Sequence, residues 1–212
     1  TRTAELIRPI LRGRDIKRYG YNWANLWLIN THNGIRGKLE RVHIEDYPAI
    51  KAHLDQYWDK ISKRADKGDT PYNLRNCAYL EDFSKPKILW KRVGSILRFC
   101  YNDNEALGLD STCFAIGNNI EFVCCILNTP MGHYLLKDAP KTGTGDLLIS
   151  VQAVEPIKLP SVTHELNIEF KRLLEMMIAN CSDDIENEIS QKIFNLYGLS
   201  HEEQRYIEEN FT

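Results

Sequence analysis

The sequence predicts an α+β fold, in which a globule with a mixed or antiparallel sheet is followed by a C-terminal helical region. Short β-leaning runs, separated by turn residues, occupy much of the first 160 residues. From Ser161 onward, apolar residues recur at helical spacing instead. With 212 residues, 43% of them hydrophobic and 26% charged, the chain suits one globular domain or one domain with an appendage. We therefore expect a globule over residues 1–160 and a helical spacer over 161–212.

The chain opens with two expected strands joined by a turn. Residues 6–11 (LIRPIL) are apolar enough for a short buried strand, and Gly13 permits a sharp turn after it. Residues 14–19 can form one helical turn that ends at Gly20, which would bring the cations of this segment close together. The apolar run at 22–30 (NWANLWLIN) predicts the second strand.

Residues 44–69 carry the clearest helical pattern of the first half. Pro48 suits the first turn of a helix, and Gly68 suits its end. The apolar residues of the segment recur at helical spacing and predict one buried stripe: Ile50, Leu54, Tyr57, Trp58 and Ile61.

Three β-leaning runs follow at close spacing and predict neighbouring strands of one sheet. They are FSKPKILWKRVG, SILRFCYND and STCFAIG. Residues 120–127 then change to a helical stripe, Pro130 begins another helix or turn, and 141–160 return to a glycine-containing loop and a strand.

The last fifty residues predict three helices. One apolar stripe runs from Leu166 to Ile178, and a second runs from Ile185 to Leu196 and ends at Gly198. Ser200 and Glu203 have the spacing of a capping box at the start of a final helix. The stripes are wide enough to require burial, either within the chain or against another part of a larger protein or a second subunit.

Cysteine usage and hydropathy favour a cytoplasmic protein. The six cysteines form no CxxC pair and mostly have apolar neighbours, so we interpret them as reduced core residues. No apolar run reaches membrane-spanning length, and no secretory signal is evident, so no membrane partner is expected. The chain begins with Thr, which suggests a piece of a longer protein.

Charge is divided unevenly along the chain. Residues 1–98 hold 20 Lys and Arg against 11 Asp and Glu, a net +9, while residues 99–212 hold 7 against 18, a net −11, which together give the −2 of the whole chain. Such a division favours a basic half that faces a polyanion and an acidic half that faces solvent. Mutual attraction of the two halves is the alternative explanation.

Nucleic-acid binding needs cations for phosphates and planar donors for base edges. The basic half supplies both kinds of side chain, on a turn, at a helix end, in a polar loop and on strands. The candidate DNA-binding residues are Arg12, Arg14, Lys17, Arg18, Lys63, Arg64, Tyr72, Arg75, Lys85, Lys87, Lys91 and Arg92. On an alternating strand, Lys85, Lys87 and Lys91 would share one face, and Arg92 would point to the other.

Catalytic and metal-binding patterns are scarce. The glycine-rich TGTGD (142–146) lacks the Lys-Ser/Thr of a phosphate loop, and the six histidines have no ligand spacing. NTPM (128–131) only distantly resembles the Asn-Pro-Pro-aromatic loop that holds a flipped adenine in amino-methyltransferases. We therefore expect no catalytic residue, metal or cofactor in this chain.

Two other functions remain open from the residues alone. Glu169 and Lys171, in the tripeptide EFK, match the end of a metal-dependent nuclease motif, although Phe170 between them belongs to a helical stripe. The basic half could alternatively bind an acidic protein partner.

The order of landmarks resembles one known family. The landmarks are IRPILRGRDIKRYGYN, then YPAIKAHLDQYWDKISKRADKGDTPYNLRNCAYLEDFSKPKILWKRVG, DSTCFAIG, FVCCILNTPMGHYLL and IKLP. They resemble the TaqI-like C-terminal specificity domain, the target recognition domain of type IIG restriction–modification enzymes and related adenine-specific DNA methyltransferases. The closing IENEISQKIFNLYGLSHEEQRYIEENF is similar to the ending VYxLYGLTxEE of such enzymes, and differs at Phe194 and Ser200.

The resemblance implies sequence-specific recognition of double-stranded DNA. It implies that the catalytic parts, a methyltransferase and in some members a nuclease, precede this region in the same polypeptide. S-adenosylmethionine, and Mg²⁺ where a nuclease is present, would then be cofactors of the full-length enzyme. The bases that are recognised vary within the family and do not follow from the resemblance.

Overall fold

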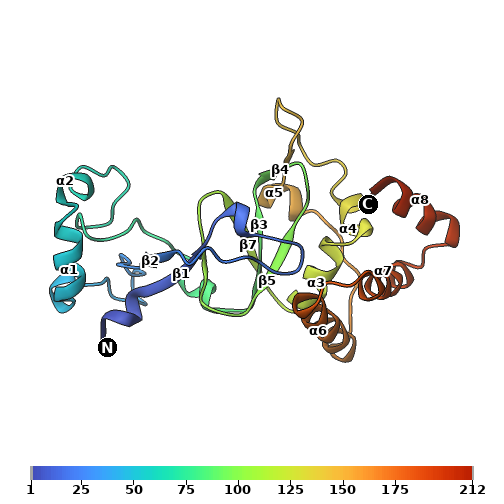
Figure 1. Ribbon diagram of the computed structural model, residues 1–212, viewed down its shortest axis with the longest axis horizontal. Coiled ribbons are helices and arrows are strands. Elements are labelled where there is room, and N and C mark those ends of the chain that lie inside the picture. Colours follow the sequence, from blue (N-terminus) through green and yellow to red (C-terminus); the bar gives the residue numbers. More distant parts are fainter. Residues whose placement is uncertain (1, 212) are drawn as a thin grey trace. The chain divides into compact units, whose positions relative to one another are not determined.

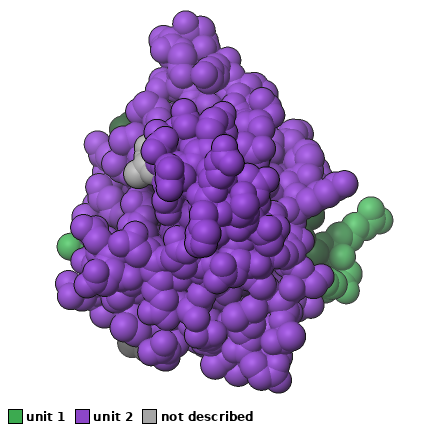
Figure 2. Space-filling view, turned by 90° about the vertical axis from the view of Figure 1, so that its right-hand side faces the viewer, with its two compact units in different colours: residues 1–10, 25–85, 105–107 green, residues 11–24, 86–104, 108–212 purple. Residues whose placement is uncertain are grey.

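The computed structural model describes residues 2–211 and confirms the α+β class. The chain forms two compact units, which Figure 2 distinguishes by colour. Unit 1 contains residues 1–10, 25–85 and 105–107, and unit 2 contains residues 11–24, 86–104 and 108–212. These units do not coincide with the division at residue 160, which stays a prediction about function.

Unit 1 has a small core of its own. Its elements are η1 (Arg2–Leu6), β1 (Ile7–Leu11), β2 (Trp27–Ile29), η3 (Ile44–Asp46), α1 (Pro48–Asp55), α2 (Trp58–Ile61) and η4 (Leu80–Ser84). The strand predicted at 6–11 is confirmed as β1, which pairs antiparallel with β2 so that Ile7 lies opposite Ile29. Leu6, Val42, Ile44 and Ile50 form the buried cluster.

The prediction of a single long helix over residues 44–69 is wrong. The helix that begins at Pro48 ends at Asp55, and the short α2 follows after a non-helical Tyr57. Of the predicted stripe, Ile50 is buried, but Tyr57 and Trp58 are each 44% exposed. The buried cluster around Ile50 does not include Tyr57 or Trp58, so burial of an apolar stripe does not continue beyond Asp55.

The main sheet of unit 2 has the expected neighbours. β3 (Lys87–Lys91) lies between β5 (Phe99–Asn102) and β7 (Thr112–Ile116), and both pairings are antiparallel (Figure 1). Leu89 lies opposite Cys100 on one side and Phe114 on the other. The three β-leaning runs of the sequence are thereby confirmed as one sheet. Its central strand is buried from Lys87 through Trp90.

The remaining elements of unit 2 are a short turn, two more strand pieces and the helices. They are η2 (Gly13–Asp15), β4 (Val93–Gly94), β8 (Leu147–Leu148), α3 (Ile120–Leu127), α4 (Pro130–Leu135), α5 (Val151–Val154), α6 (His164–Ala179), α7 (Asp183–Tyr197) and α8 (His201–Phe211). β4 pairs antiparallel with β8. The short strand β6 (Leu107–Gly108) joins β1 and β2 in a three-stranded sheet.

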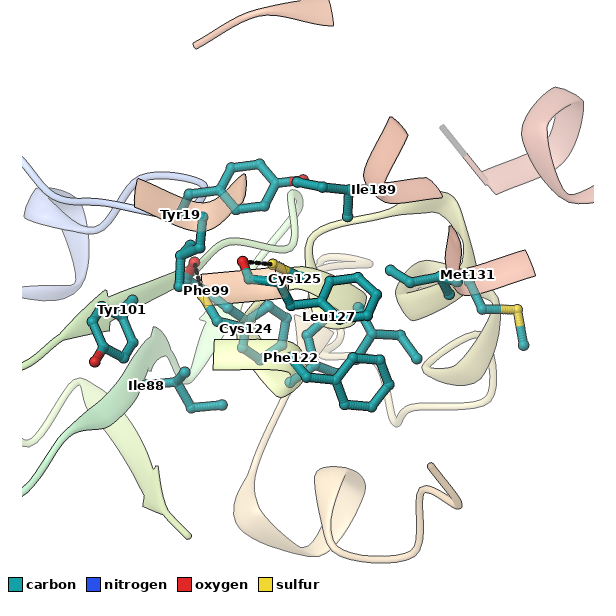
Figure 3. Close-up of a cluster of buried hydrophobic side chains, with 14 of the residues drawn as sticks. Tyr19, Ile88, Phe99, Tyr101, Phe122, Cys124, Cys125, Leu127, Met131 and Ile189 are labelled. Atoms are coloured by element: carbon teal, nitrogen blue, oxygen red, sulfur yellow. Dashed lines mark hydrogen bonds between the residues drawn. The ribbon is translucent and has the colours of Figure 1, made fainter. Parts of the chain in front are cut away.

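One core joins the sheet of unit 2 to its helices. Phe99 on β5, Phe122 on α3, Phe170 on α6 and Phe194 on α7 all belong to it, and each is at most 2% exposed. Figure 3 shows the part of this core around Phe99 and Phe122. Most of the two predicted stripes is therefore buried within the chain, although Ile178 at the end of the first stripe is 47% exposed.

The ends of the C-terminal helices follow the sequence signals. Gly198 adopts a left-handed conformation with φ 64° and ends α7. The Ser200 backbone N–H donates to the Glu203 carboxylate at 2.8 Å, and the Glu203 backbone N–H donates to Ser200 Oγ at 3.4 Å. The capping box is thus confirmed.

The prediction of a helical turn over residues 14–19 is wrong. The 3₁₀ turn η2 covers only Gly13–Asp15, and Tyr19, with φ 66°, is the residue in a left-handed conformation. Tyr19 pairs with β5, because its N–H donates to the Phe99 carbonyl and its carbonyl accepts from the Tyr101 N–H, both at 2.9 Å. Long-range pairing with a strand has replaced the local helical turn.

The cysteines are only partly in the core. Cys100, Cys124 and Cys125 are buried, Cys77 and Cys113 are half-buried, and Cys181 is exposed. All six are free thiols, and burial raises the pKa of Cys100 to about 12. None of the helices in residues 2–211 is long and apolar enough to span a membrane.

Candidate nucleic-acid interface

The turn η2 is closed by an ion pair between Arg12 and Asp15. The Arg12 guanidinium donates to both carboxylate oxygens of Asp15, at 2.7 and 3.0 Å, and the Arg12 backbone N–H donates to the same carboxylate at 2.9 Å. Asp15 is buried, and these hydrogen bonds hold the pKa of its carboxyl below its usual range. Arg12 therefore has a structural partner, whereas Arg14 on the same turn is exposed.

Lys91, at the end of β3, lies directly against this turn. A Cβ built on Gly13 would be 2.8 Å from Cγ of Lys91, and a Cβ built on Gly94 would be 3.8 Å from its Nζ. The Lys91 stem thus extends over the two glycines, and the residue remains exposed. This contact places Lys91 against the turn whose backbone carries Arg12 and Arg14, which are distant from Lys91 in sequence. We call Arg12, Arg14 and Lys91 the turn–strand cluster.

The other two candidates on or beside β3 lie elsewhere. Lys87 is fully buried and donates from Nζ to the Asn104 carbonyl at 2.5 Å. Since β3 is the central strand of its sheet and Lys87 is fully buried, the side chain has no access to solvent, which contradicts the prediction that Lys87 is a DNA-binding residue. Arg92, the residue after β3, is exposed. The direction of its side chain relative to Lys91 stays a prediction.

Arg18 is directed toward the helices. Its guanidinium donates to the Asn128 carbonyl at 2.5 Å and to the Glu186 carboxylate of α7. Lys17 is half-buried, and its backbone N–H donates to the Gly20 carbonyl. The cations of residues 12–18 therefore lie in two places. The turn that carries Arg12 and Arg14 contacts Lys91, whereas Arg18 binds α7.

Unit 1 holds the remaining candidates. Lys63 is exposed, but Arg64 donates to the Asn73 carbonyl at 2.7 Å and so braces the loop that follows. Arg75 is 72% exposed and is paired weakly with Asp66 at 3.4 Å. Of these residues, Lys63 and Arg75 keep charge that a DNA phosphate or base could use.

Tyr72 and Lys85 also lie in unit 1. The Tyr72 hydroxyl donates to Asp55 at 2.6 Å, and its ring packs against Trp58 with 5.4 Å between ring centroids. Lys85 is exposed and is paired with Asp82 at 2.7 Å. Tyr72 thus has a packing role within unit 1, whereas the Lys85 pair is a surface ion pair of the kind that is easily exchanged.

A basic hairpin in unit 1 was missed from the sequence. Ile35 and Leu39 form an antiparallel bridge, and the three residues between them make a tight turn. Arg36 and Lys38 occupy this turn. The signal was available, since Asn-Gly at 33–34 and Gly37 three residues later are typical of a hairpin. From the sequence, residues 30–34 (NTHNG) predict only a turn after the strand at 22–30.

The structure gives the nuclease motif a different role. Glu169 lies on α6 and pairs with Lys192 of α7 at 2.7 Å, and Lys171 is exposed on the same helix. An acid and a lysine on a strand beside a second acid are what that chemistry requires, and α6 does not provide this arrangement. Within the described residues, no group of three or more His, Cys, Asp or Glu side chains is placed to hold a metal ion.

Comparison with known proteins identifies a matching family and one relative of this chain. A model of the TaqI-like C-terminal specificity domain matches residues 8–152. The type II methyltransferase M.BanIII of Aneurinibacillus aneurinilyticus is 24% identical over 200 residues, which cover 88% of this chain and 34% of that protein. The chain therefore spans about a third of the length of the curated relative that it matches.

Proposed function

The chain belongs to the family of TaqI-like C-terminal specificity domains, and from this premise we infer that it is the double-stranded DNA recognition domain of a larger restriction–modification methyltransferase. Recognition of DNA follows from the family. The observation that supports a location for it in unit 2 is the packing of Lys91 on Gly13, the neighbour of Arg14 in the chain; both cations are exposed.

The two exposed members of the turn–strand cluster would contact phosphates. Cations that neutralise phosphates supply sequence-independent affinity and fix the register of a protein on the duplex. Arg12 would act differently, because its guanidinium is already paired with buried Asp15 and holds the turn in shape. The turn would thereby present Arg14 and Lys91 in a fixed position.

The rest of the parent protein would perform the chemistry. We propose that this domain is part of a longer polypeptide, as the 34% coverage of the relative suggests. A methyltransferase region would precede it, and the domain would position a target adenine for flipping into the pocket of that region. S-adenosylmethionine would be the methyl donor of that region. A nuclease of the type IIG kind, with Mg²⁺, would be a further part, and the whole enzyme would act in the cytoplasm, where its DNA lies.

A salt titration of duplex binding by the full-length protein tests this proposal. If phosphates are contacted, the logarithm of the binding constant falls linearly and steeply with the logarithm of salt concentration. Binding of an acidic protein, the remaining alternative, would predict little affinity for duplex DNA at any salt concentration. A flat dependence, or the absence of duplex binding, would reject the DNA-recognition proposal.

A further inference from the structure

Beside the hairpin of unit 1 lies an open groove of about 610 Å³. One wall is the segment 33–41, and the other is formed by Asp69 and residues 76–78. We propose that the tip of this hairpin enters the major groove of DNA and that Arg36 makes a base-specific contact there, with guanine as its partner. The inference rests on the proposed function and adds to it the residue that determines specificity.

The hairpin is rigid for reasons of local geometry. Gly34 has φ 72°, and a Cβ at this position would lie 2.4 Å from the Leu39 carbonyl oxygen, so only glycine fits. At the tip, the Lys38 and Leu39 N–H groups both donate to the Ile35 carbonyl, at 2.9 Å each. A turn held in one conformation loses little entropy when it binds, and this favours affinity and specificity.

The base of the hairpin is tied to the opposite wall by Asn33. Its amide Nδ2 donates to Asp69 at 3.0 Å and to Asn76 at 2.5 Å, and its Oδ1 accepts from the Asp69 N–H at 2.9 Å. A Cβ at Gly68 would lie 2.5 Å from Oδ1 of Asn33, so this close approach also depends on glycine. The two walls of the groove are therefore fixed with respect to each other.

Segment 33–41, which contains the hairpin, carries three cations, and two of them are paired with carboxylates. Arg41 donates to Asp69 at 3.2 Å, and Lys38 is paired with Glu81 at 3.4 Å. Arg36 is exposed and makes no hydrogen bond or ion pair with any residue between 2 and 211. Its planar guanidinium is the kind of group that binds guanine O6 and N7 with two parallel hydrogen bonds, and Arg36 lies in an exposed tight turn closed by the Ile35–Leu39 bridge.

The test is selection of binding sites from a library of duplexes with a randomised central segment, carried out with the full-length protein. The variants are Arg36→Ala, Arg36→Lys and, as the matched control on the same hairpin, Lys38→Ala. We expect both Arg36 variants to lose preference at one guanine-containing base pair by roughly 5- to 150-fold, with the other positions unchanged. Arg36→Lys should not restore the preference for this base pair, because an ammonium group cannot donate two parallel hydrogen bonds as a guanidinium does. Lys38→Ala should select the same sequence as the wild type.

The outcomes separate this inference from the proposed function. If the wild type selects a defined sequence and both Arg36 variants select the same one with undiminished preference, Arg36 is not a base-specific residue, while DNA recognition stands. If the wild type enriches no sequence, both proposals fail. Thermal unfolding of the Arg36 variants should match the wild type, since Arg36 has no intramolecular partner to lose. A uniform loss of affinity at all positions would assign Arg36 to phosphate and overturn the inference.

Discussion

The side-chain amide of Asn128 binds both backbone groups of Phe99. Its Oδ1 accepts from the Phe99 N–H at 3.1 Å, and its Nδ2 donates to the Phe99 carbonyl at 2.7 Å and to the Cys124 carbonyl at 2.9 Å. Asn128 is fully buried. The amide thus joins the end of α3 to β5 as a neighbouring strand would. The resemblance of NTPM to an adenine-binding loop is therefore explained by packing, because the polar atoms of Asn128 are used inside the protein.

Replacement of Asn128 by Ala should destabilise the protein by about 2–4 kcal/mol, because the buried Phe99 N–H would lose its acceptor and a cavity would remain. Denaturant unfolding of the purified chain measures this change. Asn187→Ala, at an exposed position on α7, is the control and should change the unfolding free energy by less than about 0.5 kcal/mol. Equal effects of the two substitutions would refute the structural role of Asn128.

Lys91→Ala should weaken binding of the full-length protein to every duplex by a similar factor. Loss of one phosphate contact lowers the slope of the salt dependence by about one. Lys171→Ala is the matched control, because Lys171 is also an exposed lysine but lies on α6 and does not belong to the turn–strand cluster. An unchanged salt slope for Lys91→Ala would remove Lys91 from the phosphate contacts. A loss of Mg²⁺-dependent DNA cleavage in Lys171→Ala would revive the nuclease alternative.

Lys87→Met should leave the salt dependence of DNA binding unchanged. The Lys87 ammonium is enclosed in unit 2 and donates to the Asn104 carbonyl, so it releases no counterion when DNA binds. The salt titration described for Lys91→Ala, which measures the slope of the salt dependence, provides the measurement. A slope reduced by about one in a folded Lys87→Met protein would show that Lys87 does reach a phosphate.

Asp15 should make the stability of unit 2 depend on pH in the acidic range. The folded-state pKa of Asp15 lies below its unfolded value, because Arg12 donates to the ionised carboxylate. In the folded state the carboxyl therefore binds fewer protons, so the stabilisation is complete above the reference Asp pKa of about 3.9 and is lost as the pH falls through the lower folded value.

Asp15→Asn isolates this contribution. Since an amide does not titrate, the variant should be less stable than the wild type at neutral pH, and the difference between the two should shrink toward about pH 3. Urea unfolding at the two pH values checks this. A difference that stays constant with pH would show that the Arg12–Asp15 pair contributes through packing and not through charge.

Local patterns in the sequence were sufficient for most individual elements. Helical spacing of apolar residues located α3, α6 and α7, and the capping residues around Gly198 and Ser200 located the helix ends. Short runs rich in β-branched and aromatic residues located the strands of the main sheet. These features depend on neighbours a few positions apart, which a sequence displays directly, and the same ordered landmarks indicated the family.

The candidate interface depended on contacts between distant residues. The sequence supplied the cations. Only the tertiary structure decided that Lys91 packs on Gly13 and stays exposed, that Lys87 is buried in a central strand, and that Arg18 is paired with Glu186. A charged side chain has the same local signature whether it meets solvent, a carboxylate or a backbone carbonyl. Its surroundings are set by long-range packing, and composition and periodicity carry no record of that packing.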